Sequence, residues 1–507
     1  MKKYVWLILG IGFLGILQSC KKNPTKIEDP VEVDKGPESE FEKKEAMLKD
    51  SVFYYTKLLS LWQDYMPPRN VNDITNSSIL RSYTSKYGTA EDVLDFLIAL
   101  TPNDPSTNKP IDRFSFLDRG GLVSGEIQNA VATNYGMYVF YLQTPMSGNN
   151  AHLYVRMVDV NSPAYEAGIR RGDRILLIDN KSNLDYNSQQ SQGFKGISEA
   201  LNSSSMKVRW VTPDSKIIEK TITSSLYNFN PILSDKVFDV NDKKVGYLAF
   251  SSFVNIENKG VLTKMYTDFQ TIFHSFEQES ITELIVDLRY NGGGAVNTAE
   301  YLADKIAPSS ADGKKKFYYK LNEVLEEWEW TEPGEEFAPV YFDKSGSLNL
   351  SKVYFLVSRS TASASELLIN SLVPYMNVQI IGPEKTYGKP VGFFGLYMDK
   401  EKSVELYATS FQMFNANDFG DYFDGLTPNK ITYEDFFKEF GDPEEGLISE
   451  ALYHIKNNKY HTGSTGNSAS SSKEGLLRDK TINIKNIGER AHDYGMFKFK
   501  GTHLKIK

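Results

Sequence analysis

Cysteine is almost absent from this sequence, since Cys20 is the single cysteine among 507 residues. One cysteine excludes an intrachain disulfide, a zinc site built from a cysteine cluster and an iron–sulfur site. Positive charge is also in deficit, because 57 Lys and Arg stand against 65 Asp and Glu, for a formal net charge of −8. This balance argues against a nucleic-acid partner, which a basic surface would signal. Histidine is scarce as well: none of the six lies in the motifs described below.

Large apolar side chains are plentiful, with 30 Tyr, 30 Phe and 5 Trp in a chain that is 40% hydrophobic. These side chains are sufficient to build sizeable cores, which excludes global disorder. The length predicts roughly three domains.

The first residues are typical of an exported protein. Lys2 and Lys3 precede an uncharged run, Tyr4 to Leu17, which is too short to span a membrane but fits a secretory signal. The following Leu17-Gln18-Ser19-Cys20 resembles a bacterial lipobox. We therefore expect a signal peptide over 1–19, a lipid on Cys20 that anchors the chain to a membrane, and a location in the cell envelope facing the periplasm or exterior. A plain signal peptide with an incidental cysteine is the alternative.

The rest of the chain predicts a multidomain fold. Proline and charge over 20–40 indicate a flexible tether, and apolar spacing of three and four residues predicts an N-terminal helical domain over 41–117. Within it we expect a helix from Phe41 that is stopped at Met66-Pro67-Pro68. Short strands over 118–228 predict a β-rich domain, and alternating strands and helices over 229–460 predict an α/β core that includes a helix at Val261–Glu277. Residues 461–507 form a low-complexity linker and a tail without an assignable element.

A serine-rich turn and a lysine-bearing turn follow apolar strands. Ser363 lies between a strand and an apolar helix, whose N-terminal N–H groups can stabilise a developing negative charge. The alternative is structural, because Ser363-x-x-Glu366 is also a capping box. Lys389 lies in a Gly-flanked turn, and a buried, neutral lysine can act as a base. Its alternative is a solvated turn lysine.

A glycine-rich loop, Asn291-Gly292-Gly293-Gly294, follows a buried strand. Glycines let backbone approach a ligand closely and can direct N–H groups at an oxyanion. Neither of the usual nucleotide-binding glycine patterns is present, so the remaining alternative is a plain turn.

The order and spacing of these three motifs over about 237–455 resemble those of the C-terminal processing, or tail-specific, peptidases. This resemblance implies a serine peptidase core that cleaves protein or peptide substrates without a metal or cofactor. By resemblance Ser363 is the nucleophile and Lys389 the general base, while backbone N–H groups of Gly293 and Ala364 hold the oxyanion. One position departs from the family, since Phe393 stands where many members carry a glutamine thought to orient the lysine.

Residues 161–179 resemble a PDZ domain, a module that this family commonly carries before its core. The resemblance places a carboxylate-binding loop at Tyr135, Gly136 and Met137, before a strand edge that can accept a peptide by β-augmentation. Substrates would then be bound through their C-termini. Three alternatives stay open: a degenerate PDZ domain that only separates its neighbours, an inactive peptide-binding lipoprotein scaffold, which Phe393 favours, and a lipid-anchored solute-binding protein.

Overall fold

The computed structural model describes residues 40–144, 147–462, 482–487, 493 and 495–499. The chain divides into two compact units, Met1–Lys44 and Glu45–Lys507, and the following description concerns the second. The predicted signal peptide, Cys20, nearly all of the predicted tether and most of the low-complexity linker lie outside the described residues. In the described part of the chain, no helix is both long and apolar enough to cross a membrane.

Three helices open the described chain: α1 (Glu40–Leu59), α2 (Ser77–Thr84) and α3 (Ala90–Ala99). Helix α1 ends at Leu59, earlier than the predicted stop at Met66-Pro67-Pro68. The buried Lys57 explains the early end, because its amine donates to the carbonyl oxygens of Gln63 and Met66, at 2.7 and 3.0 Å, and so holds the chain in a tight turn. The apolar faces of α1 and α3 pack into the same core as one face of the large sheet.

An antiparallel sheet builds the β-rich module, which we define as residues 135–223. Its strands are β3 (Met137–Gln143), β4 (His152–Val158), β5 (Arg174–Ile178), β6 (Ser205–Val211) and β7 (Ile217–Thr223), in that spatial order. The helices α4 (Pro163–Ala167), α5 (Tyr186–Gln190) and α6 (Lys195–Leu201) complete the module. Ser162 caps α4 and Gly168, at φ 97°, ends it.

The boundary predicted at residue 118 falls inside a strand of another sheet. Strand β1 (Phe116–Arg119) pairs with β21 (Val404–Tyr407), which lies in the α/β part of the chain, and β21 also pairs with β20 (Leu396–Tyr397). Two strands, β2 (Val131–Asn134) and β8 (Ser225–Asn228), pair with each other where the chain enters and leaves the module.

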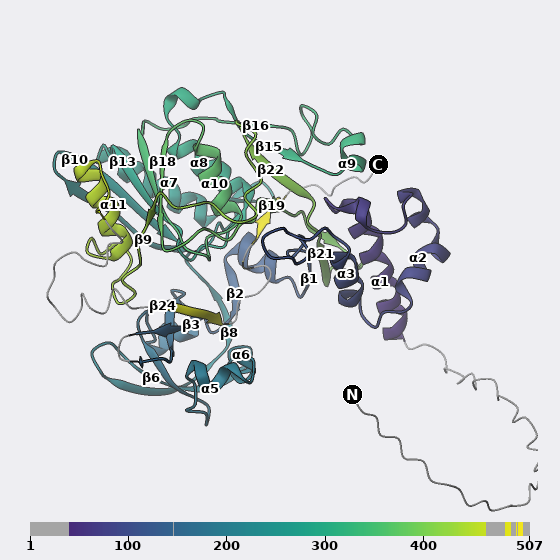
Figure 1. The fold of residues 1–507 in the computed structure, drawn as a ribbon, viewed down its shortest axis with the longest axis horizontal. Coiled ribbons are helices and arrows are strands. Elements are labelled where there is room, and N and C mark those ends of the chain that lie inside the picture. The colour runs from purple at the N-terminus through teal and green to yellow at the C-terminus, as the bar shows by residue number, and fades with distance from the viewer. Residues whose placement is uncertain (1–39, 145–146, 463–481, 488–492, 494, 500–507) are drawn as a thin grey trace, which may run out of the picture. The chain divides into compact units, whose positions relative to one another are not determined.

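A six-stranded sheet forms the centre of the α/β part. Its order is β23 (Lys430–Ile431), β18 (Asn377–Gly382), β17 (Lys352–Leu356), β13 (Glu283–Asp287), β10 (Lys243–Phe250) and β9 (Ile232–Val240). All neighbouring pairs are parallel except β10 with β9. Both faces are apolar, as a covered parallel sheet requires. Alternate residues of each strand pack on α7 (Lys264–Gln278), α8 (Val296–Ile306) and α10 (Ala364–Leu372) on one face, and on α11 (Gly446–Asn457) on the other (Figure 1).

Helix α7 begins three residues later than predicted. Val261–Leu262, assigned to this helix from the sequence, form strand β12 and pair with β11 (Glu257–Asn258). Thr263 follows in an extended conformation and precedes the first helical residue, so the helix cannot extend back through it.

A second sheet flanks the large one, and the chain's tail adds to two others. The second sheet has the order β16 (Val340–Tyr341), β15 (Lys315–Lys320), β22 (Phe411–Asn415) and β19 (Val391–Gly392). The tail, for which we predicted no element, contributes β24 (Ile482–Ile487), antiparallel to β3, and β25 (Met496–Phe497), parallel to β14 (Gly294–Ala295).

Candidate active site

Three loops meet at the carboxyl edge of the large sheet, and they carry the three motifs. Residues 291–294 follow β13, residues 358–363 follow β17 and residues 386–389 follow β18. The Ala362 N–H donates to the Asn291 carbonyl at 3.2 Å, and the Tyr387 N–H donates to the Thr361 carbonyl at 2.9 Å. The fold therefore brings together motifs that lie far apart in the sequence.

Ser363 occupies a strained turn directly before α10. Its φ of 63° and ψ of −114° are rarely adopted by a residue with a side chain, and such strain is often found at functional sites. The side chain is buried, and its hydroxyl oxygen has no hydrogen-bond partner among the described residues. The Ser363 N–H donates to Glu366 Oε2 at 2.8 Å, which is the glutamate half of the predicted capping box. The serine hydroxyl is thus not held by a hydrogen bond to any described residue.

Lys389 is fully buried beside two aromatic rings. Its amine lies 4.0 Å from the centroid of the Phe393 ring and 4.8 Å from that of Phe114. Burial lowers the pKa of Lys389 well below its usual value, although nearby Asp112 and Glu366 act in the opposite direction. A solvated turn lysine, the alternative reading from the sequence, is therefore wrong for this residue. No hydrogen bond to Ser363 Oγ is formed within the part of the chain that the structure describes.

The Glu366 carboxylate connects the serine turn to the lysine turn. Oε2 accepts the N–H groups of Ser363 and Lys389, each at 2.8 Å. Oε1 accepts the Gly388 N–H at 2.8 Å and the Thr386 hydroxyl. Burial raises the pKa of Glu366 and these hydrogen bonds oppose that rise. The sequence showed this residue only as a capping partner, because its contacts with 386–389 exist only in the folded chain.

The residues predicted to hold an oxyanion lie side by side. Gly293 has φ 109°, and a Cβ atom added to it would lie 2.9 Å from the Ala364 nitrogen, so the two backbones touch. The Gly293 N–H, however, donates to Asn291 Oδ1 at 2.9 Å. In this structure that N–H is held by the asparagine rather than directed at open space.

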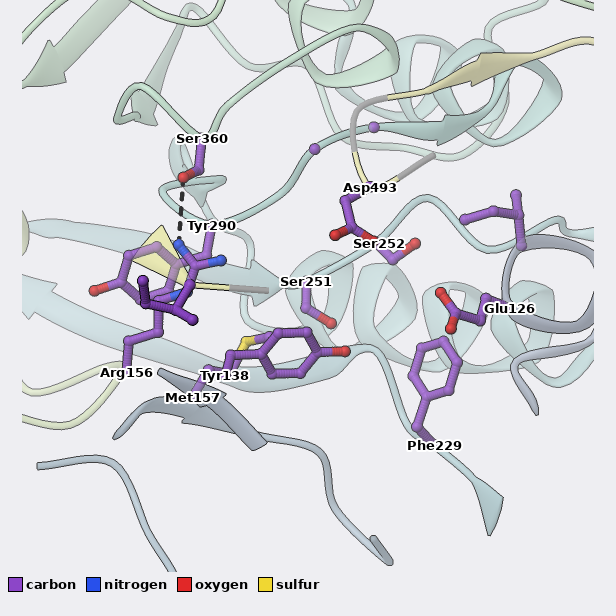
Figure 2. A pocket seen from close by; sticks show the side chains of 14 residues that line it. Glu126, Tyr138, Arg156, Met157, Phe229, Ser251, Ser252, Tyr290, Ser360 and Asp493 are labelled. Carbon is purple, nitrogen blue, oxygen red and sulfur yellow. Dashed lines mark hydrogen bonds between the residues drawn. The ribbon is translucent and has the colours of Figure 1, made fainter. Parts of the chain in front are cut away.

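A cavity of about 90 Å³ lies next to the glycine loop, between the β-rich module and the α/β part. Its lining residues include Tyr138, Arg156 and Met157 from the module, Gly292, Gly293 and Ser360 from the loops after β13 and β17, and Ile487 and Asp493 from the tail. Figure 2 shows Arg156 reaching across to Ser360, to which it donates at 3.4 Å. Ser363 and Lys389 do not line this cavity, so it adjoins the candidate catalytic pair without including it.

A buried ionic cluster joins the module to the glycine loop. Arg171 of the module pairs with Glu434 at 3.1 Å and donates to the Tyr290 hydroxyl at 3.0 Å. Arg289 pairs with Glu445 at 2.8 Å and also contacts Glu434. Because Tyr290 directly precedes Asn291, the module contacts the chain next to the glycine loop. We did not predict this cluster, since nothing in the spacing of its charges marks it.

Tyr135, Gly136 and Met137 lie at the start of β3, where the resemblance placed a carboxylate-binding loop. The Tyr135 hydroxyl donates to the Ser203 carbonyl at 2.7 Å, and the Gly136 N–H donates to Asn134 Oδ1 at 2.6 Å. A Cβ atom on Gly136 would come within 2.2 Å of Ser162 Cβ, so only glycine fits this turn.

Part of the chain is similar to known peptidases in sequence and in fold. Residues 244–429 match peptidase family S41. The chain is 24% identical over 260 residues, 50% of its length, to carboxyl-terminal-processing peptidase 3 of Arabidopsis thaliana, a chloroplast protein, of whose length the match covers 45%. A solved structure from Bacteroides fragilis NCTC 9343, described as that of an S41 protease, has a TM-score of 0.59 at 23% identity, over 80% of this chain and 97% of the other. A photosystem II D1 C-terminal processing protease aligns over 77% of this chain and 93% of its own, at 17% identity and a TM-score of 0.46.

Proposed function

Because the chain carries a peptidase family S41 domain over residues 244–429, we propose that it is a serine endopeptidase of the C-terminal processing type, with Ser363 and Lys389 as its catalytic dyad. One observation carries the proposal: a buried, uncommitted serine hydroxyl and a buried lysine lie on two turns held by the same carboxylate, that of Glu366. No described histidine is needed for this chemistry.

The lowered pKa of Lys389 favours the neutral form of its amine, which is the form that can accept a proton. In the proposed first step the Ser363 hydroxyl gives its proton to Lys389 Nζ while Oγ attacks the peptide carbonyl. Lys389 then passes this proton to the leaving amine as the C–N bond breaks, which leaves an acyl-enzyme. Water deacylates it, with Lys389 taking the water proton and returning one to Ser363.

Backbone N–H groups of Gly293 and Ala364 are the proposed oxyanion donors. Their close approach supports this role. For Gly293 to donate to an oxyanion, its N–H must leave Asn291 Oδ1, which the local glycines permit because they rotate easily. The active geometry therefore differs from the described one by a rotation of the glycine loop and by closure of the Ser363–Lys389 hydrogen bond.

The β-rich module is proposed to be a PDZ domain that captures substrates through their C-termini. Its support is strand β3, which begins at Met137 directly after Tyr135 and Gly136, and the contacts of Arg156 with Ser360 and of Arg171 with Tyr290. We further propose that the chain is held at the cell envelope by a lipid on Cys20, for which the lipobox-like sequence is the support.

An inactive peptide-binding scaffold is the second candidate function. The unformed Ser363–Lys389 hydrogen bond and the engaged Gly293 N–H favour it. Turnover and peptide binding separate the two candidates.

The deciding experiment measures cleavage of an unfolded reporter protein by the purified soluble chain. We expect Ser363→Ala to lower kcat/KM by at least about 10⁴-fold and Lys389→Ala to lower it comparably. Ser371→Ala is the matched serine control, because its buried hydroxyl bonds within α10 to the Leu367 carbonyl. Lys385→Ala is the lysine control, since this residue lies on the same turn but is exposed and pairs with Asp424. A wild-type chain that binds peptides without cleaving them would support the scaffold instead.

A further inference from the structure

The C-terminal segment of the chain reaches both places where the proposed peptidase would bind a peptide. Strand β24 lies along β3 of the β-rich module, and strand β25 lies along β14, next to the glycine loop (Figure 1). The two strands come from a tail that plays no part in the proposed chemistry.

Strand β24 pairs with the edge of β3 that is not paired with β4. The pairing is antiparallel, with Ile487 opposite Val139 and Ile482 opposite Gln143. The other edge of β3 is paired with β4, so β3 has no further edge for an incoming strand. A peptide that binds by β-augmentation must therefore displace β24.

The Ile487 side chain is inserted into the module. It is 7% exposed and belongs to the module's apolar core, together with Met137, Val139 and Ile197. Ile487 is also the residue of β24 nearest to the predicted carboxylate loop, because the antiparallel register ends there. A main-chain ladder together with an apolar side chain in a pocket is the pattern by which such edges recognise extended peptides.

The same segment contacts the catalytic loops. Asn486 Nδ2 donates to Ser360 Oγ at 3.3 Å, three residues before Ser363. Further along, the Gly294 N–H donates to the Gly495 carbonyl at 2.6 Å, and the Phe393 N–H donates to the Met496 carbonyl at 2.9 Å. Met496 and Phe497 are both buried. The tail thus contacts the loop that precedes Ser363, the end of the glycine loop and the backbone of Phe393, four residues after Lys389.

We infer that the C-terminal segment is an intramolecular ligand of the β3 edge, with which peptide substrates must compete. If the chain is the proposed peptidase, the bound tail also lowers its turnover, and this consequence rests on the proposed function. The partner that fits the edge is an extended peptide whose branched apolar residue takes the place of Ile487. Tethering gives the tail an effective concentration that a free peptide must overcome.

The test compares peptide binding by the full-length chain and by its Ile487→Asp variant, which places a charge in the apolar core of the module and so releases β24 without altering residues 135–223. The probe is a fluorescent peptide that copies residues 476–487 and ends in a free carboxylate at Ile487. We expect the variant to bind the probe at least about tenfold more tightly, by fluorescence anisotropy. Ile217→Asp is the control, because it makes the same change at an exposed position of β7, on the opposite edge of the module's sheet, and it should bind as the wild type does.

Equal affinity of the wild type and a folded Ile487→Asp chain would overturn the inference. If thermal unfolding shows that Ile487→Asp has lost its fold, deletion of residues 482–487 decides in its place, because it removes β24 and leaves residues 135–223 unaltered. Turnover of an unfolded reporter should rise severalfold in the variant. Tighter probe binding without turnover in either chain would support the tail inference and contradict the proposed peptidase.

Discussion

The Lys389 amine lies 4.0 Å from the centre of the Phe393 ring. Phe393 stands at the sequence position where the peptidases that this chain resembles usually carry a glutamine. Phe393 is fully buried and packs in turn on Phe497 of the tail, with ring centroids 5.6 Å apart. An aromatic ring cannot accept a hydrogen bond as an amide oxygen does. It can exclude water from the amine, and burial of this kind lowers the pKa of Lys389.

Replacing Phe393 by Ala should move the acid limb of the pH–rate profile to higher pH. The ring has two opposing effects, since its face attracts the cation by about 0.5–2 kcal/mol, whereas burial can shift a lysine pKa by up to 3–5 units, about 4–7 kcal/mol. Burial is the larger effect, so admitting water should raise the pKa of Lys389 toward its usual value. The profile of kcat/KM against pH measures this. A shift to lower pH would show that the ring acts mainly by attracting the cation.

Lys389→Met should abolish turnover and yet raise the thermal unfolding temperature. The pKa of Lys389 is lowered in the folded chain, so between that value and about 10.5 the unfolded chain binds more protons and stability rises with pH. The buried amine therefore weakens the fold most at low pH. Melting curves at about pH 6 and about pH 9 should show a larger gain for the variant at the lower pH. A gain that grows toward alkaline pH would contradict this account.

Glu366→Ala should impair both stability and turnover. It leaves the buried N–H groups of Ser363, Gly388 and Lys389 without their acceptor, at a cost of about 1–3 kcal/mol for each group. The stability and turnover of Glu366→Gln should lie between those of the wild type and of Glu366→Ala. Its oxygen still accepts from one pair of donors, whereas its NH₂ group faces the other pair. Denaturant unfolding and reporter cleavage measure the two effects. Full turnover in a stable Glu366→Gln chain would show that the carboxylate does not align the dyad.

Arg171→Ala should uncouple the β-rich module from the glycine loop. It removes the partner of Glu434 and the donor to Tyr290, and loss of one member of a buried ion pair typically costs about 3–5 kcal/mol. Arg289 still contacts Glu434, so we expect the lower end of that range. Arg170→Ala is the control, because its guanidinium bonds only to carbonyls within the module. Equal melting temperatures for both variants would show that Arg171 does not couple the module to the glycine loop.

Cys20→Ala should release the full-length chain from membranes into the soluble fraction, because the thiol that would carry the lipid is gone. Fractionation of cells that express wild type and variant measures this. Retention of the variant in the membrane fraction would show that Cys20 is not the anchor.

The sequence by itself determined much of the secondary structure and the identity of the candidate dyad. The buried strand expected before the glycine loop (β13) and the strand and apolar helix expected on either side of Ser363 (β17 and α10) are confirmed, because short apolar runs and apolar periodicity are local signals. Ser363 and Lys389 were assigned from the resemblance of their motifs to those of a peptidase family, and the fold brings these motifs and the glycine loop to one edge of the large sheet. The alternation in Thr481-Ile482-Asn483-Ile484 carries the period of a strand, so β24 was also within reach of the sequence.

Tertiary structure alone decided how these groups are held. Glu366 became the acceptor shared by Ser363 and Lys389 only when α10 packed beside the loop after β18, since Lys389 is 23 residues away from Glu366 in the sequence. The neutral state favoured for Lys389 likewise depends on burial among Phe114, Phe393 and their neighbours, which no local pattern encodes. The docking of β24 on β3 pairs residues more than 300 positions apart. Such long-range contacts arise from packing, and local sequence preferences do not specify them.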